Sequence, residues 1–520
     1  MSSRRHSRIT TIAACGALVA GVLVSASGGA HADTETGNLP GGTGLSVSID
    51  SPDDNAVMPL GDVTVSGGAS VGQAAPVKNT GVVFVMDLSG STIASGGACG
   101  GDLNSDGSAN TILDCEVAAS MALNNTAVSN GTVGEAGLAV FGSSGAATDV
   151  QPDAMVQLNT APDADRNSNS ARDMDEVFTS VDFGSIGLFS PFNVGSGSTN
   201  FVAAVQTANQ AAATMASPNK VVAFMSDGAS NVFSGNAVTE VGNRPAGTTY
   251  YTFAVGSGAS CTNAGSQGSL AQIATATGGT CTSVTDVSSL PDILPGVVEA
   301  TLDSLEISVN GGTSAPVTAS ATLPVTGPES VTYSHTLTGL GSGVHDVCVR
   351  ANGTDVGGTG SVTDCHQIVL YDPSDGFVTG GGSIASPIGA YVPDPTLEGK
   401  ATFGFVSKYQ RGATIPSGNS QFVFHAAGLS FHSTSYDWLV VPGANAQYKG
   451  TGTVSGLDAA LNGTYKFMIW ATDGALAGSG GADAFRIKLW QEDALGAETV
   501  LYDNGSGSTL TGGSIIIHKK

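Results

Sequence analysis

The chain has 520 residues, a formal net charge of −25 at pH 7 and a sequence pI near 4.3. Its length predicts three or more domains with substantial hydrophobic cores. The acid is concentrated in residues 33–371, which hold 31 acidic and 6 basic residues, whereas residues 372–520 hold 12 and 9. Such a surface repels nucleic acid and anionic lipid and attracts cations, so nucleic acid is excluded as a partner.

Residues 1–32 are typical of a secretory signal peptide. A basic start, "MSSRRHSR", precedes the apolar stretch "IAACGALVAGVLVSA" and the small-residue end "AHA", which predicts cleavage before Asp33. A membrane anchor is the alternative, but the apolar stretch is short and ends in a cleavage-like site. No second apolar stretch is long enough to span a bilayer. We therefore expect a secreted, extracellular protein with no membrane span in the mature chain.

Six cysteines remain after the expected cleavage, an even number that implies disulfides in an exported protein. Six cysteines allow 15 pairings, yet they form three local couples separated by long gaps, which favours sequential pairing. A zinc site is the alternative, but the sequence has no close CxxC and no clustered histidines. The expected disulfides are Cys99–Cys115, Cys261–Cys281 and Cys348–Cys365.

The elements change character along the chain. In residues 33–79, "LSVSID" and "DVTVSGGASV" alternate apolar and small polar residues, as half-buried strands do. Residues 80–304 instead alternate continuous apolar runs ("GVVFVMD", "EAGLAVFG", "KVVAFMSDG", "TYYTFAVG") with helical patterns such as "NFVAAVQTANQAAATM". Buried strands alternating with helices predict a parallel, doubly wound, Rossmann-like α/β domain.

After Leu305 the alternating strand pattern returns, which predicts an Ig-like β domain over residues 305–371. It forms one β-sandwich with residues 33–79, into which the α/β domain is inserted, or the two segments form separate units. Residues 375–520 hold all three tryptophans and predict a separate all-β domain, a β-sandwich or jelly roll. The expected fold class is therefore multi-domain α/β plus all-β.

A candidate metal site follows from the apolar run "GVVFVMD". In an open α/β sheet, ligands collect at the carboxyl ends of the strands, and this run delivers Asp87 there. The next residues add the hydroxyls of Ser89 and Ser91, while Thr199 lies in the glycine-rich loop "GSGSTN" and Asp227 ends another buried strand. Carboxylates and hydroxyls are hard oxygen donors, suited to Mg²⁺, Mn²⁺ or Ca²⁺.

In order, "VVFVMDLSGST", "GSTNFVAAV" and "VVAFMSDGASN" resemble the von Willebrand factor type A (VWA) domain. The resemblance covers about 225 residues and implies a metal-ion-dependent adhesion site (MIDAS). It also implies that the bound ion keeps one coordination position for an acidic group of a protein partner. The alternative is that these are ordinary polar residues at strand ends. The implied ligands, direct or through water, are Asp87, Ser89, Ser91, Thr199 and Asp227.

The segment between Cys99 and Cys115 has the alternating Asp and Asn residues, followed by a glycine, that are typical of a calcium-binding loop. Position 12 of an EF-hand should bring a carboxylate but is Leu113, so a conventional EF-hand is excluded and an EF-like loop remains, with Asp114 or Glu116 turned inward. A Cys99–Cys115 bond would close the loop and lower the entropy cost of ordering it. The alternative is a solvated turn held only by the disulfide. The expected Ca²⁺ ligands are Asp102, Asn104, Asp106, Ser108, Asn110 and Asp114, with Gly107 at the sharp turn.

A second acidic stretch, "PDADRNSNSARDMDE", alternates similarly. Ser168 stands where a glycine would help and two arginines intervene, so a solvated acidic loop is an equal alternative. The candidate ligands here are Asp163, Asp165, Asn167, Asn169 and Asp173.

No nucleophile elbow of the GxSxG type lies on a strand-to-helix turn, and we expect no enzymatic activity. The sequence thus predicts a secreted adhesion or binding protein whose VWA domain holds a divalent cation and engages an acidic group of a cell-surface or extracellular protein. The C-terminal domain is expected to bind cell envelope or carbohydrate. One alternative is a calcium-stabilised structural protein without metal-dependent ligand binding. A further one is an exported hydrolase in the C-terminal domain.

Overall fold

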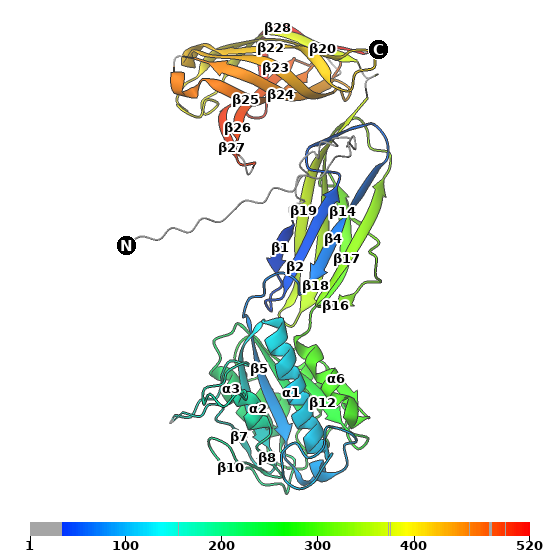
Figure 1. The fold of residues 1–520 in the computed structure, drawn as a ribbon, viewed down its shortest axis with the longest axis vertical. Coiled ribbons are helices and arrows are strands. Elements are labelled where there is room, and N and C mark those ends of the chain that lie inside the picture. Colours follow the sequence, from blue (N-terminus) through cyan, green and yellow to red (C-terminus); the bar gives the residue numbers. More distant parts are fainter. Residues whose placement is uncertain are drawn as a thin grey trace, which may run out of the picture.

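The computed structural model describes residues 34–519 except residues 154, 373, 375, 457, 478–480, 494 and 495. The expected signal peptide, residues 1–32, lies outside the described residues. The chain forms an α/β part, a two-sheet β part and a C-terminal barrel, which follow one another along the long axis (Figure 1). None of the helices in the described ranges has the length and apolar character needed to cross a membrane.

The two-sheet β part is built from both sides of the α/β segment. β17 runs antiparallel to β4 from the pair Glu329–Val71 to the pair Leu337–Val63, and β3 lies parallel to β19. The strands before residue 80 and those after residue 300 therefore form one unit, which decides between the two arrangements left open by the sequence. One sheet has the order β1 (Glu35–Asn38), β2 (Gly44–Ser51), β4 (Val63–Val71), β17 (Glu329–Leu337). The other has the order β15 (Ala315–Pro316), β14 (Thr301–Val309), β18 (Gly343–Asp355), β19 (Gly358–Tyr371), β3 (Ala56–Pro59), with β16 (Val325–Thr326) paired to β14.

Polar contacts join the distant segments of this part. The buried Asp355 carboxylate accepts hydrogen bonds from the Gly41 N–H at 2.8 Å and the Thr43 N–H at 3.3 Å. The Tyr333 hydroxyl donates to the Ser48 carbonyl at 2.8 Å. Each contact satisfies a buried polar group and connects residues 285 to 314 positions apart, so the two halves hold each other in register.

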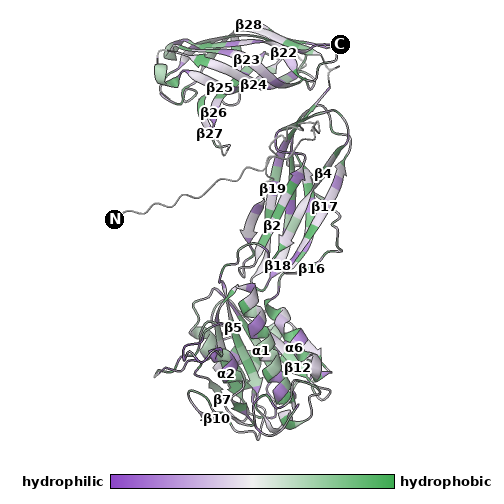
Figure 2. Cartoon of the chain, viewed as in Figure 1, coloured by the Kyte–Doolittle hydropathy of each residue, from purple (hydrophilic) through white to green (hydrophobic). Residues whose placement is uncertain are grey.

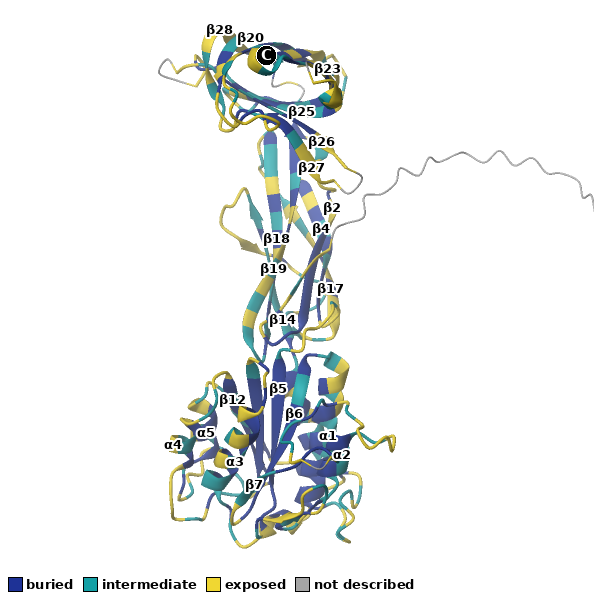
Figure 3. Ribbon diagram, turned by 90° about the vertical axis from the view of Figure 1, so that its left-hand side faces the viewer, coloured by how far each residue is buried: buried dark blue, intermediate teal, exposed yellow. Residues whose placement is uncertain are grey.

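The α/β part contains a mixed six-stranded sheet. β5 is buried along its whole length because its apolar run has no exposed face (Figures 2 and 3). Val82, Phe84 and Met86 enter one hydrophobic core, whereas Val83 and Val85 enter a second core on the other side of the sheet. All neighbouring strands are parallel except β7, which lies antiparallel at the edge. The order is β13 (Cys281–Val284), β12 (Thr248–Val255), β11 (Asn219–Ser226), β5 (Thr80–Asp87), β6 (Val133–Phe141), β7 (Gly145–Ala147).

The helices of this part vary widely in length. The longest is α1. It begins at a capping box formed by Thr111 and Asp114, and it ends at Gly131, which has a left-handed conformation with φ of 68°. Between β7 and α3 the chain forms short α2 and a three-stranded antiparallel sheet instead of a strand–helix alternation. The helices are α1 (Ile112–Asn130), α2 (Asp173–Phe178), α3 (Phe201–Ala213), α4 (Ala237–Val241), α5 (Leu270–Thr275) and α6 (Leu290–Ile293). The small sheet has β8 (Val181–Asp182), β9 (Ser185–Ile186) and β10 (Phe192–Asn193).

The C-terminal part is a closed barrel of eight strands with a ninth at its side. The ring closes because β28 pairs with both β20 and β26, while β25 pairs with β26. Aromatic rings fill it, including Phe403 stacked on Phe485 with ring centroids 3.9 Å apart. The strands are β20 (Phe377–Ser386), β21 (Gly399–Tyr409), β22 (Pro416–Phe424), β23 (Leu429–Val440), β24 (Asn445–Ser455), β25 (Gly463–Thr472), β26 (Ala484–Glu492), β27 (Glu498–Asp503) and β28 (Ser508–His518).

The fold class expected from the sequence is wrong. The chain is mostly β, with 45% of residues in strands and 15% in helices, and is not a doubly wound Rossmann-like VWA protein with sandwich domains. The C-terminal domain is a closed barrel and not a β-sandwich or jelly roll. The error has a physical cause, because inward apolar and outward polar residues alternate identically along a sandwich strand and a barrel strand. Only the pairings that close the ring, β28 with β20 and β26 and β25 with β26, separate the two.

Candidate functional site

The site is built around Asp87, the last residue of β5. Its carboxylate is fully buried: Oδ1 accepts from the Ser89 N–H at 2.9 Å and Oδ2 accepts from the Ser226 hydroxyl at 2.6 Å. The Asp87 N–H donates to Glu116 Oε2, on α1, at 2.9 Å. Two donors thus hold the Asp87 carboxylate and a third contact holds its backbone N–H before any ligand is considered.

The hydroxyls and the second carboxylate continue from Asp87 as one chain of contacts. Ser89 Oγ lies 3.1 Å from Ser91 Oγ, and Ser91 Oγ donates to Asp227 Oδ1 at 2.8 Å. Asp227 directly follows β11, the strand beside β5. The carboxyl ends of these two parallel strands therefore bring together four of the five residues named from the sequence.

Thr199, the fifth residue, lies on a loop attached to the same edge. Its N–H donates to Asn231 Oδ1 at 2.9 Å, and its carbonyl accepts from the Asn231 N–H at 3.1 Å. The Gly90 N–H donates to the Ser196 carbonyl at 2.8 Å, which joins this loop to the Ser89–Ser91 turn. In the described residues no hydrogen bond connects the Thr199 hydroxyl to the other four.

The buried carboxyl groups at this edge of the sheet are unfavourable in their ionised form when no cation is present. Burial, and then the nearby Asp227 charge, raise the pKa of Asp87 to about 7. Burial and the Asp87 charge hold the pKa of Glu116 well above its usual range, and burial also raises the pKa of Asp227. Three carboxyl groups in a shared, poorly hydrated region need either protons or a cation to neutralise them.

The donor set suits a hard divalent cation. No group of three or more His, Cys, Asp or Glu side chains arranged to hold a metal occurs in the described part of the chain. The cluster instead combines the carboxylates of Asp87 and Asp227 with hydroxyl oxygens, which are ligands for Mg²⁺, Mn²⁺ or Ca²⁺. Because burial disfavours the ionised carboxylates, an ion would relieve a charge repulsion that the fold already contains.

The loop between Cys99 and Cys115 adopts a compact Asx-rich turn. Asp102 Oδ1 and Oδ2 accept from the N–H groups of Asp106 and Gly107 at 3.1 and 3.0 Å. Asn104 Nδ2 donates to Asp106 Oδ2 at 3.0 Å, and the buried Asn104 Oδ1 has no hydrogen-bond partner among the described residues. The Cys99–Cys115 disulfide closes the loop, and the other two expected disulfides are present as well, Cys261–Cys281 and Cys348–Cys365.

The carboxylates expected to complete this loop have other roles. Asp114 Oδ2 accepts from the N–H and hydroxyl of Thr111, at 2.8 and 2.9 Å, and Asp114 Oδ1 accepts from the Leu103 N–H at 2.8 Å. Asp114 is therefore the N3 residue of the capping box that starts α1, whose N-cap is Thr111. Glu116 is directed to Asp87 and not to the loop. Asn110 Oδ1 accepts from the Cys99 and Gly101 N–H groups, at 3.2 and 3.0 Å.

The second acidic stretch repeats the geometry of the first, starting at Asp165. Asp165 Oδ1 and Oδ2 accept from the N–H groups of Asn169 and Ser170 at 3.1 and 3.0 Å. Asp102 likewise accepts from the N–H groups four and five residues after it in the chain. Ser170 has φ of 73°, at the place that Gly107 takes in the first loop. Asp163, the expected first ligand, is exposed and precedes this turn, and Asp173 accepts from the Arg166 N–H.

Glu176 is the residue of this loop that the sequence analysis missed. Counted from Asp165 it occupies position 12, where an EF-hand carries its bidentate glutamate. Its Oε2 accepts from Asn167 Nδ2 at 2.8 Å and its Oε1 from Asn169 Nδ2 at 2.6 Å. Counting from Asp163 hid this spacing, and the count from Asp165 would have found it. Ser226 and Asn231 were also missed, whereas Glu116 was considered only for the calcium loop and not as a partner of Asp87. The sequence signal for Glu116 is that it interrupts an apolar helix face.

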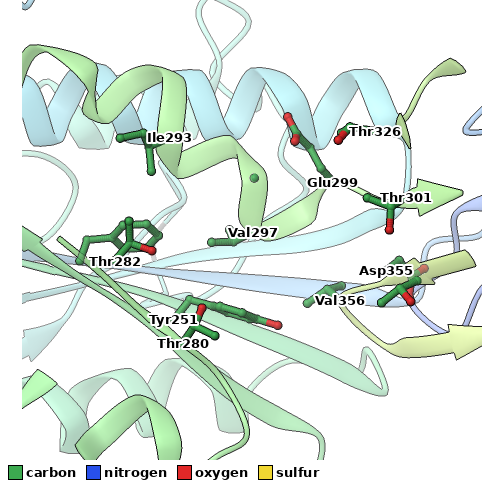
Figure 4. A pocket seen from close by; sticks show the side chains of 13 residues that line it. Tyr251, Thr280, Thr282, Ile293, Val297, Glu299, Thr301, Thr326, Asp355 and Val356 are labelled. Carbon is green, nitrogen blue, oxygen red and sulfur yellow. The ribbon is translucent and has the colours of Figure 1, made fainter. Parts of the chain in front are cut away.

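A separate cleft of about 450 Å³ lies between the β12–β13 edge and the β14–β18 strands (Figure 4). Apolar residues such as Tyr251 and Val297 line it together with Glu299 and Asp355. Burial and the Asp355 charge raise the pKa of Tyr251. Because the Asp355 oxygens already accept from backbone N–H groups, the cleft holds a structural contact instead of a second cluster of ligands.

Comparisons with known proteins give distant likenesses only. No protein-family model and no curated protein matches the chain. Among solved structures, the ArnB paralog VWA2 from Sulfolobus acidocaldarius is 14% identical, with a TM-score of 0.26 over 63% of this chain and 75% of that one. The proximal thread matrix protein 1 of the mussel byssus is 16% identical (TM-score 0.27, 44% and 50% covered). A D319A mutant of the PilB minor pilin from Streptococcus sanguinis is 12% identical (TM-score 0.29, 49% and 77% covered). TM-scores this low carry no argument about fold or function.

Proposed function

We propose that Asp87, Ser89, Ser91, Thr199 and Asp227 form a metal-ion-dependent adhesion site that holds a divalent cation and engages an acidic group of a protein partner. The observation that carries the proposal is the continuous contact chain from Asp87 through Ser89 and Ser91 to Asp227. It joins hard oxygen donors from two neighbouring strand ends around a carboxylate that burial leaves without solvent. Mg²⁺, Mn²⁺ or Ca²⁺ would supply Lewis acidity toward a partner carboxylate.

The protein's own residues orient the site. Ser226 and the Ser89 N–H fix the two Asp87 oxygens, and Asn231 fixes the Thr199 backbone. A bound divalent cation would favour the ionised forms of Asp87 and Asp227, against the raised pKa values that these groups have without an ion. The hydroxyls of Ser89, Ser91 and Thr199 are neutral ligands, so a partner carboxylate would complete the ion's coordination in this proposal. In this proposal the protein acts outside the cell, and the barrel serves as a second binding module for envelope or carbohydrate.

Isothermal titration calorimetry of Mg²⁺, Mn²⁺ and Ca²⁺ into the mature chain tests the proposal. Asp87→Ala and Asp227→Ala should each abolish one binding event, because each removes one of two carboxylates. Asp182→Ala, which removes an exposed charge from the same part of the chain, is the matched control and should leave binding unchanged. Equal binding by the wild type and the Asp87→Ala variant would reject the site.

A second function, calcium-dependent stabilisation, is favoured by two observations on the acidic loops. The buried Asn104 Oδ1 lacks a partner, and Glu176 faces Asn167 and Asn169 from position 12. Rotating the two amides would present oxygen instead of nitrogen to an ion held by the Glu176 carboxylate. Ca²⁺ should raise the melting temperature of the wild type, and Glu176→Gln should reduce that rise. If Ca²⁺ raises the melting temperature of the Glu176→Gln and Asp102→Ala variants as much as that of the wild type, both loops are excluded as calcium sites.

A further inference from the structure

Three apolar side chains stand exposed on the loops that carry the proposed metal ligands. Ile93 is 56% exposed, Phe192 48% and Phe233 94%. Ile93 follows Ser91 by two residues, and Phe233 follows Asp227 by six. Phe192 lies in β10, on the segment that leads into the Thr199 loop. Single exposed apolar residues are common on protein surfaces, but these three share the loops of one site.

These loops are held by hydrogen bonds, so the exposure is part of a built surface. Beside Ile93, the Thr92 side chain is buried and donates to the Ser89 carbonyl at 2.8 Å, which turns the next residue outward. Before Phe233, Asn231 is tied to Thr199 on both its side chain and its N–H, and the Val232 carbonyl accepts from Ser266 Oγ at 2.5 Å.

The Phe192 segment is anchored in the same way. The Gly195 N–H donates to Asn193 Oδ1 at 2.9 Å, and the Gly195 carbonyl accepts from the Ser143 N–H at 2.8 Å. One residue further, the Ser196 carbonyl accepts from the Gly90 N–H in the Ser89–Ser91 turn. All three loops therefore belong to the carboxyl edge of the sheet, around the ligands.

We propose that Ile93, Phe192 and Phe233 form an apolar rim that selects a partner in which an aspartate or glutamate is flanked by apolar side chains. The inference rests on the proposed function, since the partner's carboxylate would bind the cation. Residues 33–371 hold 31 acidic and 6 basic residues, so their net charge repels an acidic partner, whereas the ion would attract the partner's carboxylate. Attraction beyond the ion must then come from apolar contact, and the burial of one phenylalanine accounts for tenfold or more in affinity.

A bead-bound synthetic peptide library tests the rim. Each peptide carries a central glutamate with randomised neighbours, and a matched library carries glutamine instead. Binding of the mature chain is compared in Mg²⁺ and in EDTA. Leu, Ile or Phe should be enriched beside the glutamate, only in Mg²⁺ and only in the glutamate library. Phe233→Ser should weaken binding of the most enriched peptide about tenfold while leaving the Mg²⁺ calorimetry unchanged.

The control variant is Val156→Ser, which removes an exposed apolar residue (64%) from the segment between β7 and α2 and should bind as the wild type does, because that segment carries none of the five proposed adhesion-site ligands. Mg²⁺ binding without any enriched peptide, or with enrichment that Phe233→Ser does not affect, overturns the rim and leaves the metal site standing. A wild type that binds no divalent cation overturns the proposed function, and the rim with it.

Discussion

Replacing Asp87 by asparagine separates the electrostatic cost of this carboxylate from its shape. In the native chain its pKa is raised from 3.8 to about 7, so the folded state holds a proton that the unfolded state releases. Stability from this group is complete below pH 4 and is lost as the pH rises through 7. A shift of about 3 units corresponds to at most about 4 kcal/mol, at 1.36 kcal/mol per unit.

Asparagine can keep the local contacts without the charge. Its oxygen accepts from the Ser89 N–H, and its amide nitrogen faces Ser226 Oγ, which can donate to the Gly228 carbonyl, 3.3 Å away. In EDTA we therefore expect Asp87→Asn to be more stable than the wild type at pH 8, by about 2 to 4 kcal/mol, and equal to it near pH 4. In Mg²⁺ the order at pH 8 should reverse, because only the wild type gains binding energy.

Urea unfolding followed by circular dichroism at 222 nm measures this difference, since all six α-helices of the described residues lie between residues 112 and 293. Asp182→Asn, which removes an exposed carboxylate, is the control and should show little pH dependence relative to the wild type. A difference between Asp87→Asn and wild type that stays constant from pH 4 to pH 8, or a less stable variant at pH 8 in EDTA, would refute the reasoning.

Three further predictions concern the parts that support the site. Phe403→Ala should destabilise the barrel by about 3 to 5 kcal/mol, because it removes a ring stacked on Phe485. Urea unfolding followed by tryptophan fluorescence measures this loss, since all three tryptophans lie in the barrel. An unchanged midpoint of unfolding would contradict the prediction. Asp355→Ala should lower the free energy of unfolding by about 2 kcal/mol or more, because the Gly41 and Thr43 N–H groups lose their acceptor. Urea unfolding measures this loss. Glu299→Ala, in the same cleft, is the control and should leave the stability nearly unchanged. Replacing Cys99 and Cys115 by serines should lower the free energy of unfolding by about 3 kcal/mol, because the opened loop gains entropy in the unfolded chain. Urea unfolding followed by circular dichroism at 222 nm measures this loss. Equal stability of the variant and the wild type would show that the turn is ordered without the disulfide.

Local features were readable from the sequence because they depend on neighbouring residues alone. A continuous apolar run demands a strand buried on both faces, and the residue that ends it, Asp87, must then lie at the sheet edge. The contact of Ser89 and Ser91 with this edge follows from their spacing. The disulfides were readable too, because each couple of cysteines is separated by 20 residues or fewer.

What only the tertiary structure decided depends on pairings across long stretches of chain. One of the two partners of β4, β17, lies more than two hundred residues away. The eight-stranded ring exists because β28 returns to β20 and β25 pairs with β26. An alternating strand pattern specifies one buried face and carries no information about which strand closes the sheet, so the barrel was mistaken for a sandwich. The sequence placed Asp87 and Asp227 at strand ends and named both with Ser91 as one site, because these positions follow from local apolar runs. Only the fold placed Glu116, from a helix, against the Asp87 N–H, because that contact depends on how α1 packs on the sheet.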